Sequence, residues 1–389
     1  MAGTADVVVV GGGVIGLSAA WEAARRGLSI ALVDPAPGRG AGWVAAGILA
    51  PVSETSSERP TLARLFCAAA DRWPAFAARL EAATGLATGF QACGAVAVAL
   101  CASDREALEG LLAAHRALGR EASALSASEC RSVVDLLSPA LDSGVLVPGD
   151  HQVDNRALMT ALVEACAGAG VQTIAERAAA LELDAHGAVA GVATARGDVV
   201  RGRWAVLAAG AWTPQIGGVP AGVLPAVRPV KGHVVRLRAA GGRQVFSHVV
   251  SGYVYGRHRY LVARADGSVV VGATVEERGF DTTVQAGALR SLLDDARLLV
   301  PSADDWEYVE CLAGLRPGSP DGAPFVGATR VPGLLVATGH YRNGLLLAPI
   351  SAEAIAEHLT AGTVLSPFEA FPPDRSGISS ASSGPSEAS

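Results

Sequence analysis

Hydrophobic and polar positions follow two periods along this chain, and the clearest example is its opening stretch. Residues 6–10 form a short apolar run rich in β-branched side chains, which predicts a strand buried on both faces. Apolar residues then recur at helical spacing over residues 14–26, and a second apolar run covers residues 29–33. The pattern predicts a strand, a helix and a second, parallel strand, the unit that builds doubly wound α/β sheets.

The same two periods predict the remaining elements. Helices are expected over residues 62–84, 103–118, 126–133, 155–167, 284–299 and 345–359. Strands are expected over residues 90–100, 145–148, 171–175, 180–183, 188–194, 198–201, 205–208, 227–237, 248–255, 260–263, 268–274, 308–315 and 334–337. Asp154 is placed to cap the helix that follows it, and Ser103 with Glu106 has the spacing of a capping box.

The order of these elements predicts two interleaved domains rather than two consecutive ones. Strand and helix units of the nucleotide-binding kind occur at the start, the middle and the end, and mostly antiparallel strands fall between them. We therefore expect an α/β fold in which a Rossmann-like domain is interleaved with an α+β domain built on a mostly antiparallel sheet. The first domain takes residues 1–52, 145–225 and 315–365, and the second takes residues 53–144 and 226–314. Residues 366–389, rich in Pro, Ser and Gly, are expected to form a disordered tail.

Composition narrows the class of protein. Half of the 389 residues are hydrophobic, but no apolar run approaches the roughly 18 residues of a membrane span, so no membrane partner is expected. The short opening run lacks the basic flank of a signal peptide. A net charge of −6 without a basic block argues against nucleic acid. The six cysteines form no C-x-x-C pair and no metal-ligand spacing, which indicates reduced thiols in a cytoplasmic protein without a metal site.

A glycine-rich turn links the first strand to the first helix. Gly11, Gly13 and Gly16 form G-x-G-x-x-G in the strand–turn–helix context of a dinucleotide site, and Asp34 ends the second strand. The first glycine permits a tight turn, the second lets backbone approach a pyrophosphate, and the third lets helix pack on strand. Asp34 can accept hydrogen bonds from ribose hydroxyls. The alternative is a glycine-rich turn that only packs the helix against the strand.

Two later strands also end on glycine, at Gly210 and Gly339. Strands that end in this way place backbone at a ligand crevice, and three such ends suit an elongated cofactor better than NAD. Residues 43–49 are mostly small, which either lets backbone lie close to a flat ligand or marks an ordinary helix start.

Several of these segments together resemble one family. They are residues 11–16, 45–49, 229–232, 271–274, 313–318 (Ala-Gly-Leu-Arg-Pro-Gly) and 339–344 (Gly-His-Tyr-Arg-Asn-Gly). Over about residues 5–365 the chain resembles flavin-dependent amine oxidases of the D-amino-acid oxidase family, and within them the glycine oxidases of the thiamin pathway. The last two segments are the motifs most specific to this family. The interleaved domains would then be an FAD-binding domain and a substrate domain.

The resemblance implies that the cofactor is FAD, bound non-covalently. It implies cofactor contacts at Gly11, Gly13, Val14, Ile15, Gly16, Asp34, Ala46, Gly47, Ile48, Leu49, Ala179, Gly210, Arg316, His340, Arg342, Asn343, Gly344 and Leu345. The chain departs from the family at Asp34, where glutamate is usual. Related sarcosine oxidases bond the flavin to a cysteine near the position of Cys311, for which a buried strand thiol is the alternative.

The resemblance also implies three catalytic residues. Arg316 would clamp the substrate carboxylate with two charge-assisted hydrogen bonds, and Tyr260 would add a third contact. The alternatives are an arginine in a turn and a tyrosine at a strand edge. Arg342 would face flavin or substrate, or shape its own loop. His340 could equally be a packing histidine, and Lys231, the only lysine, could have a functional or a structural role.

The activity implied is oxidation of a small amine. Glycine, sarcosine or a small D-amino acid would be oxidised to an imine, with O2 reduced to hydrogen peroxide, and thiazole synthase could take the imine. A tetramer is the family expectation. Open alternatives are a dehydrogenase with another electron acceptor and a flavin-binding protein without turnover. Val249, Val254 and Ala50 are candidates for setting the substrate pocket.

Overall fold

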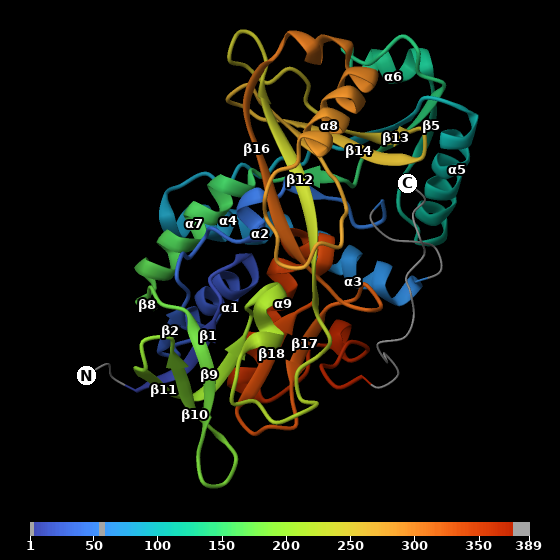
Figure 1. The fold of residues 1–389 in the computed structure, drawn as a ribbon. Helices are drawn as coiled ribbons and strands as arrows, with labels where there is room; N and C mark the ends of the chain where they lie inside the picture. The colour runs from blue at the N-terminus through green and yellow to red at the C-terminus, as the bar shows by residue number, and fades with distance from the viewer. Residues whose placement is uncertain (1–3, 54–58, 376–389) are drawn as a thin grey trace.

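The fold consists of two large sheets with helices around them (Figure 1). The structure is a computed structural model that describes residues 4–53 and 59–375. Within these residues the chain forms two eight-stranded sheets and a small pair, β3 (Ile48–Leu49) with β7 (His151–Gln152). Short helical segments are α2 (Ala41–Val44), η1 (Gly210–Gln215), η2 (Pro301–Asp305), η3 (Tyr341–Asn343) and η4 (Ser366–Phe368).

The first sheet has a parallel centre. In spatial order its parallel strands are β18 (Leu334–Thr338), β11 (Val199–Leu207), β1 (Ala5–Val10), β2 (Ile30–Val33) and β8 (Gln172–Ile174). The antiparallel strand β17 (Phe325–Ala328) lies beside β18. The pair β9 (Ala178–Leu183) and β10 (Val189–Thr194) extends the amino-terminal half of β11. The carboxyl ends of the parallel strands share one edge, where such sheets bind ligands.

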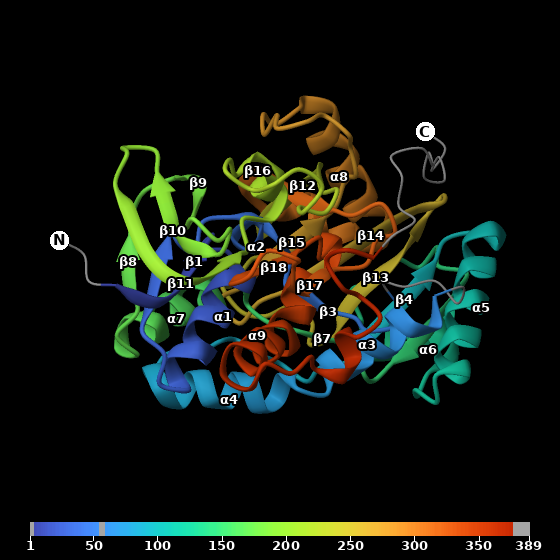
Figure 2. The ribbon, with the colours of Figure 1, turned by 90° about the horizontal axis from the view of Figure 1, so that it is seen from below.

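Both faces of the first sheet are covered, as the apolar run of β1 predicts. Val7 and Val9 belong to one core cluster and Val8 and Val10 to another, and all four are at most 2% exposed. Figure 2 shows helices gathered on one side of this sheet. They are α1 (Val14–Arg25), α3 (Pro60–Ala70), α4 (Trp73–Thr84), α7 (Asn155–Gly168) and α9 (Gly344–Ala361).

The second sheet is mostly antiparallel. Its order is β16 (Glu307–Gly318), β12 (Arg228–Arg238), β15 (Ser268–Gly272), β14 (Arg257–Ala263), β13 (Val249–Val254), β4 (Ala95–Ala99), β6 (Ser143–Val147) and β5 (Ser123–Ser126). β13 and β4 are its one parallel pair among the described strands. Helices α6 (Ala127–Val133) and α8 (Ala286–Leu299) pack on one face, and α5 (Ala102–Ala117) packs on the other. Figure 1 shows β12 and β16 running from this sheet toward the first one.

The expected fold class, a Rossmann-like region interleaved with a mostly antiparallel unit, is confirmed. Two segments belong to a different unit from the one predicted for their sequence range: the strand β6 and the helix pair α3 and α4. β6 pairs with β4 in the second sheet, although its last three residues fall in the range 145–225. Helices α3 and α4, in the range 53–144, pack in the core of the first unit, where Trp73 Nε1 donates to the Leu346 carbonyl at 3.0 Å. Their apolar stripes fit the face of α9.

Several predicted elements differ in extent. The helix expected over residues 62–84 is two helices, because Pro74 has no N–H to donate to Ala70 and its ring would clash with that carbonyl. The strands expected over residues 198–201 and 205–208 are the single strand β11, since its amino-terminal half has its own partner in β10.

The helix caps give a mixed outcome. Asp154 is confirmed as a cap, since its side chain accepts from the Arg156 and Ala157 amides. The capping box at Ser103 is wrong, because α5 begins at Ala102 with Cys101 as its N-cap, so Ser103 lies inside the helix. A capping box does form at Ser126, with Glu129 as its partner.

The predicted tail does not begin at residue 366. Residues 366–375 follow α9 back onto the first unit, where Phe368 and Phe371 are buried. Arg375 pairs with Asp321 at 2.9 Å and lies 3.6 Å from the ring centroid of Phe325. The sequence rule failed here because a few aromatic side chains outweigh a polar composition. Residues 376–389 lie outside the described residues. No helix in the described ranges has both the length and the apolar character needed to cross a membrane.

Candidate functional site

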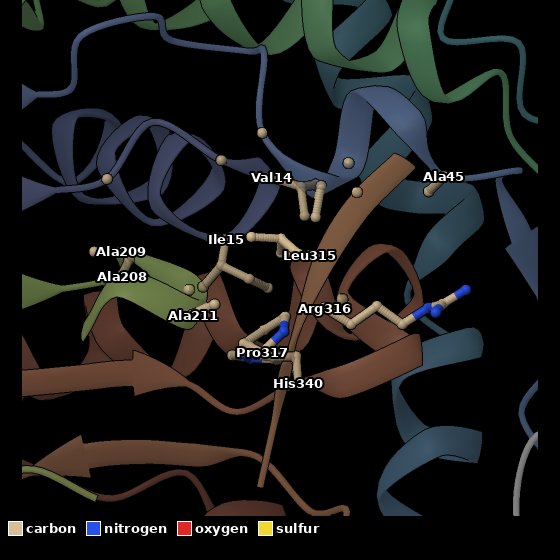
Figure 3. A pocket seen from close by; sticks show the side chains of 18 of the residues that line it. Val14, Ile15, Ala45, Ala208, Ala209, Ala211, Leu315, Arg316, Pro317 and His340 are labelled. Atoms are coloured by element: carbon tan, nitrogen blue, oxygen red, sulfur yellow. The ribbon is translucent and has the colours of Figure 1, made fainter. Parts of the chain in front are cut away.

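A cavity of about 630 Å³ lies where the carboxyl edge of the first sheet meets one face of the second. Figure 3 looks into it, with Val14 and Ile15 of α1 and Leu315 and Arg316 of β16 among the side chains that line it. The predicted residues that line it are Gly11, Gly13, Val14, Ile15, Asp34, Ala46, Gly47, Ile48, Gly210, Tyr260, Arg316, His340, Arg342, Asn343, Gly344 and Leu345. The structure therefore brings together residues that are dispersed over almost the whole sequence.

The glycine-rich turn places the amino terminus of α1 at this cavity. Gly11 has a φ of +104°, and a Cβ there would lie 2.5 Å from the Ala208 carbonyl oxygen. At Gly16 a Cβ would lie 1.8 Å from the Gly11 oxygen, so this glycine lets helix and strand touch and does not line the cavity. Gly13 caps α1 without a side-chain hydrogen bond and faces open space. An exposed helix amino terminus bordered by glycine suits the phosphates of a dinucleotide.

Asp34 lies at the cavity with its carboxylate already oriented. Oδ2 accepts from the Gly12 amide and Oδ1 from the Ala36 amide, each at 2.7 Å. A carboxylate has about four lone-pair positions, so both oxygens retain acceptor capacity. Asp34 can therefore accept from a ribose hydroxyl while it holds the glycine-rich turn in place.

Buried polar side chains fix the backbone of residues 42–47. Asn155 Nδ2 donates to the carbonyls of Gly42 and Trp43, both at 2.8 Å. Arg264, only 3% exposed, donates to the Ala46 carbonyl and, at 2.6 Å, to Gln152 Oε1. Burial lowers the pKa of the Arg264 guanidinium from its ordinary value. The small residues of this segment therefore present backbone to the cavity on a rigid support.

The sequence reasoning missed both supporting residues. Asn155 is the first residue of α7, and Arg264 directly follows β14. No local pattern marks them, because their partners lie more than 100 positions away in the chain.

One face of the second sheet forms the opposite wall. Tyr260 pairs with Gly272, and Gly272 pairs with Val234 on the next strand. Directly opposite residues of an antiparallel pair point to the same face, so Tyr260 and Val234 share one face. A Cβ on Gly272 would lie 2.4 Å from Tyr260 Oη, which shows that the phenol lies over this glycine.

Arg316 reaches across the same face. Its partner on β12 is Val230, which shares the face of Gly232 and Val234. The guanidinium lies over Gly232, where a Cβ would be 2.1 Å from Nη1. Nη1 donates to the carbonyls of Lys231 at 3.3 Å and Thr274 at 3.0 Å. Arg316 is therefore held in one orientation beside the cavity, on the wall that also carries Tyr260.

The turn between β18 and α9 forms a further wall of the cavity. His340 is 2% exposed, its Nε2 lies 3.0 Å from Ser351 Oγ, and burial lowers its pKa to about 3, so the imidazole is neutral at ordinary pH. Tyr341 has a φ of +47°. Arg342 Nη2 lies 3.4 Å from His258 Nδ1, and α9 begins at Gly344. A second helix amino terminus thus points at the cavity.

Some predicted positions do not line the cavity. Leu49 is 1% exposed and belongs to the core, and Ala179 uses its carbonyl to accept from the Gly217 amide at 2.9 Å. Arg177 and Ala178 line the cavity where Ala179 was expected, and Arg39 lines it without having been predicted.

The residues proposed to set the substrate pocket are also elsewhere. Val249, Val254 and Ala50 are buried but do not line the cavity, whereas Val44 and Val234 do. In the part of the chain that the structure describes, no group of three or more His, Cys, Asp or Glu side chains is placed to hold a metal ion.

Comparison with known proteins gives a consistent result. The glycine oxidase of Pseudomonas putida is 34% identical over 378 residues, which cover 96% of this chain and 99% of that protein. The bifunctional protein ThiO/ThiG of Synechocystis is 33% identical over 96% of this chain but only 54% of its own length, so this chain spans about half of that relative. The crystal structure of glycine oxidase from Geobacillus kaustophilus matches with a TM-score of 0.87 at 31% identity, covering 96% of this chain and 99% of that one.

The family comparison agrees with the cavity described above. The family model described as "FAD dependent oxidoreductase", DAO, matches residues 6–358. That range contains both helix amino termini, the glycine-rich turn and Arg316, which fit an elongated nucleotide cofactor. The cofactor is FAD, and the chain belongs to the DAO family of FAD-dependent oxidoreductases.

Proposed function

We propose that this FAD-dependent oxidoreductase oxidises glycine, or a comparably small amino acid, to an imine with O2 as electron acceptor. The observation that supports this most is that Arg316 and Tyr260 lie on the same wall of the FAD cavity. A guanidinium matches a carboxylate with two parallel hydrogen bonds, and a phenol hydroxyl can add a third. The cavity has the size typical of cofactor and small-ligand sites.

Each of these residues has a defined part in substrate binding. Arg316 would hold the carboxylate, since its guanidinium is already fixed by two carbonyls. Tyr260 would orient the same carboxylate through its hydroxyl. Arg342, on the opposite turn, would close the site or shape the loop that accepts the amino group. Holding the substrate carbon in one position contributes to rate because it removes the entropy of alignment from the reaction.

The walls of the cavity support a placement of the cofactor. When bound, FAD supplies the oxidising chemistry, taking a hydride from the substrate carbon and passing electrons to O2. The turn at Gly11 to Gly13 would hold its phosphates and Asp34 its ribose. Residues 46–48 and 344–345 would hold the flavin ring. We propose that it is not covalently bound, because Cys311 does not line the cavity and burial raises the pKa of its thiol.

The proposal also includes a role in thiamin synthesis and an oligomeric state. ThiO/ThiG proteins among the relatives support a role in thiamin synthesis, with thiazole synthase receiving the imine. We propose a cytoplasmic homo-oligomer, with a tetramer as the expected form. The cysteines, all free, fit a reducing compartment.

Purification followed by a visible spectrum tests the cofactor. Anaerobic addition of glycine then tests the reaction, because a bound substrate that is oxidised bleaches the flavin. In air, uptake of O2 should be matched by an equal amount of peroxide. Relative rates on glycine, sarcosine, D-alanine and D-proline separate the substrate classes. Bleaching without O2 uptake would identify a dehydrogenase, and no bleaching by any amine would contradict the proposal.

The arginine assignment has its own test. Arg316→Ala should raise the KM for glycine by the equivalent of about 1.5–3 kcal/mol, the usual worth of a hydrogen bond to a charged group. The matched control is Arg196→Ala, which removes an arginine with a 78% exposed side chain and should leave KM unchanged. Unchanged glycine kinetics in Arg316→Ala would count against the assignment.

A further inference from the structure

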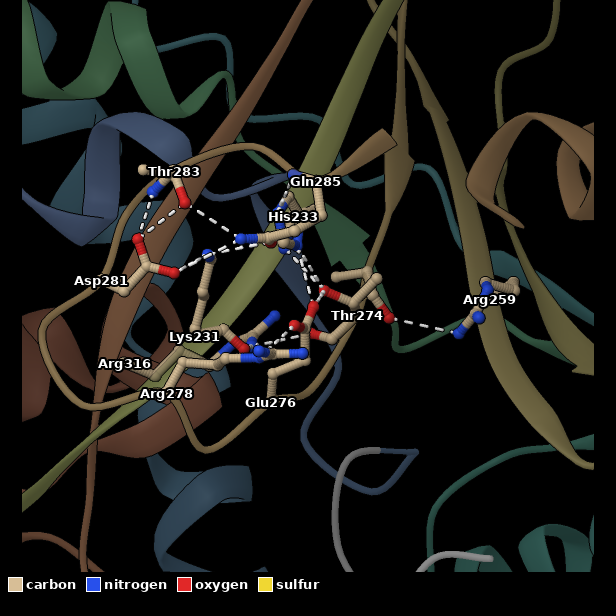
Figure 4. A network of polar contacts seen from close by, with 11 residues as sticks. Lys231, His233, Arg259, Thr274, Glu276, Arg278, Asp281, Thr283, Gln285 and Arg316 are labelled. Atoms are coloured by element: carbon tan, nitrogen blue, oxygen red, sulfur yellow. Dashed lines mark hydrogen bonds and ion pairs between the residues drawn. The ribbon is translucent and has the colours of Figure 1, made fainter. Parts of the chain in front are cut away.

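Lys231, the only lysine of the chain, is completely buried. It lies on β12 next to Gly232 but, unlike Gly232, it does not line the cavity. Nζ lies 2.8 Å from Asp281 Oδ2 and 3.0 Å from Gln285 Oε1 (Figure 4). Both partners belong to the loop of residues 273–285, which we name the β15–α8 loop. The ammonium therefore attaches this loop to β12.

The backbone of Lys231 holds the same loop. Its N–H donates to the Glu276 carbonyl at 2.8 Å, and its carbonyl accepts from the Glu276 amide at 2.9 Å. Together they form an antiparallel bridge, which extends the sheet by one residue pair beyond β15. Lys231 thus fixes the loop twice, through its main chain and through its side chain.

The loop in turn contacts the arginine proposed to bind the substrate. The guanidinium of Arg316 crosses β12 above Gly232 and reaches two carbonyls on the far side. One carbonyl is that of Lys231 itself, and the other is that of Thr274 in the β15–α8 loop. The position of the loop therefore decides where one of the two acceptors of Arg316 lies.

Further hydrogen bonds hold the β15–α8 loop in one conformation. Thr274 Oγ1 accepts from the His233 amide at 2.9 Å and lies 3.0 Å from Glu276 Oε1. Asp281 accepts from the amide and hydroxyl of Thr283. His233 links the two ends of the loop, because its Nδ1 lies 2.9 Å from Thr274 Oγ1 and its Nε2 accepts from the Gln285 amide at 3.4 Å (Figure 4). A displacement of Gln285 after the loss of Lys231 therefore reaches Thr274.

The buried ammonium is suited to holding the loop because water does not reach it, so its hydrogen-bond partners must come from the protein. An unpaired charge in a dry site is strongly unfavourable, which holds Lys231 and the loop together. The carboxylate partner remains available, since the Lys231 and Thr283 hydrogen bonds hold the pKa of Asp281 well below its ordinary value. The attachment is therefore present over the whole neutral pH range.

We propose that Lys231 is a positioning residue for the substrate carboxylate, because its attachment of the β15–α8 loop fixes the carbonyls that orient Arg316. The inference rests on the proposed function, in which Arg316 binds that carboxylate. Lys231 itself does not line the cavity.

The test compares two ligands of the holoenzyme that differ in charge. Glycolate keeps the carboxylate of glycine, and glycolamide replaces it by a neutral amide. Their dissociation constants are measured from the change in the flavin's visible absorption. Lys231→Met should weaken glycolate binding by about tenfold and glycolamide binding little, since a misplaced guanidinium loses most toward a charged partner. The KM for glycine should rise while kcat is unchanged.

The matched control is Glu277→Gln in the same loop. Glu277 pairs with Arg228 at 3.0 Å on the surface, with side chains 68% and 49% exposed, and should leave both constants unchanged. Amide hydrogen exchange supplies a readout without ligand: Glu276, bonded to Lys231, should exchange faster in Lys231→Met and as in the parent in Glu277→Gln.

A lower melting temperature with an unchanged ratio of the two constants would overturn the inference, because Lys231 would then only stabilise the fold. Should Lys231→Met not fold, Gln285→Leu removes one acceptor of Nζ without leaving a bare charge, and the ratio should change by about threefold in the same direction. An unchanged ratio there would also overturn it. If the parent holoenzyme binds neither ligand, the proposed function fails instead.

Discussion

Gly232 offers the sharpest test of how Arg316 is held. In Gly232→Ala the new Cβ would lie 2.1 Å from Nη1, 2.3 Å from Nη2 and 2.4 Å from Cζ of Arg316. Ordinary contacts between such atoms are about 3.5 Å, so the guanidinium must withdraw by more than about 1 Å. The backbone can accept alanine, because Gly232 lies within β12 and is not among the glycines with positive φ. The substitution should therefore displace a side chain and leave the fold intact.

The expected loss follows from that displacement. A misplacement of about 1 Å in a binding group lowers the rate by roughly 100-fold. Loss of a charge-assisted hydrogen bond costs about 1.5–3 kcal/mol, and this energy corresponds to a similar fold-change. We expect kcat/KM for glycine to fall by about 100-fold, measured by O2 uptake, with flavin content and melting temperature close to the parent.

The control is Gly110→Ala in α5, where nothing lies within 4 Å of an added Cβ, and it should leave kcat/KM unchanged. A Gly232→Ala enzyme that keeps kcat/KM within about threefold of the parent, less than about 1 kcal/mol, would refute the reasoning.

Three further substitutions test other features. Arg316→Lys keeps the charge but loses the two-pronged geometry, so steady-state kinetics should show a KM for glycine raised by about tenfold. His340 has a folded-state pKa of about 3 against an ordinary value of about 6.5. As pH is lowered, His340 is therefore protonated in the unfolded chain at a higher pH than in the folded protein. The free energy of unfolding should fall as pH drops from about 6.5 to 3, by up to about 1.4 kcal/mol per pH unit. Urea unfolding at several pH values should show this slope reduced in His340→Asn. Phe368→Ala should lower the free energy of unfolding by about 3 kcal/mol in the same assay, because Phe368 is 1% exposed.

The opening of the fold could be predicted because each local signal agrees with the tertiary structure. Gly11 has a positive φ, and Gly16 must lack a side chain because the Gly11 carbonyl, five positions earlier, lies against it. Both requirements are contained in the local G-x-G-x-x-G spacing. The helix over residues 62–84 failed for a different reason: its apolar stripe continues through Pro74, and the periodicity outweighed the chemistry of a missing N–H.

The site was predictable where motifs carry it and not where packing does. Arg316 and Tyr260 were predicted from short sequence motifs, and both line the cavity. Val249 and Val254 were chosen from strands of the right sheet, but they belong to its buried clusters and not to the cavity. The strand register that decides such questions depends on partners far along the chain, which no local pattern contains.

The packing of α1 against α9 has a consequence for how this protein is made. Arg26, just beyond α1, pairs with Glu357 of α9 at 2.7 Å, and 331 positions separate them. A ribosome delivers the amino-terminal strand and helix first, yet the helix that covers them emerges only near the end of translation. The nascent chain therefore carries an uncovered apolar face through most of its synthesis, and a chain interrupted before residue 344 leaves that face without its partner.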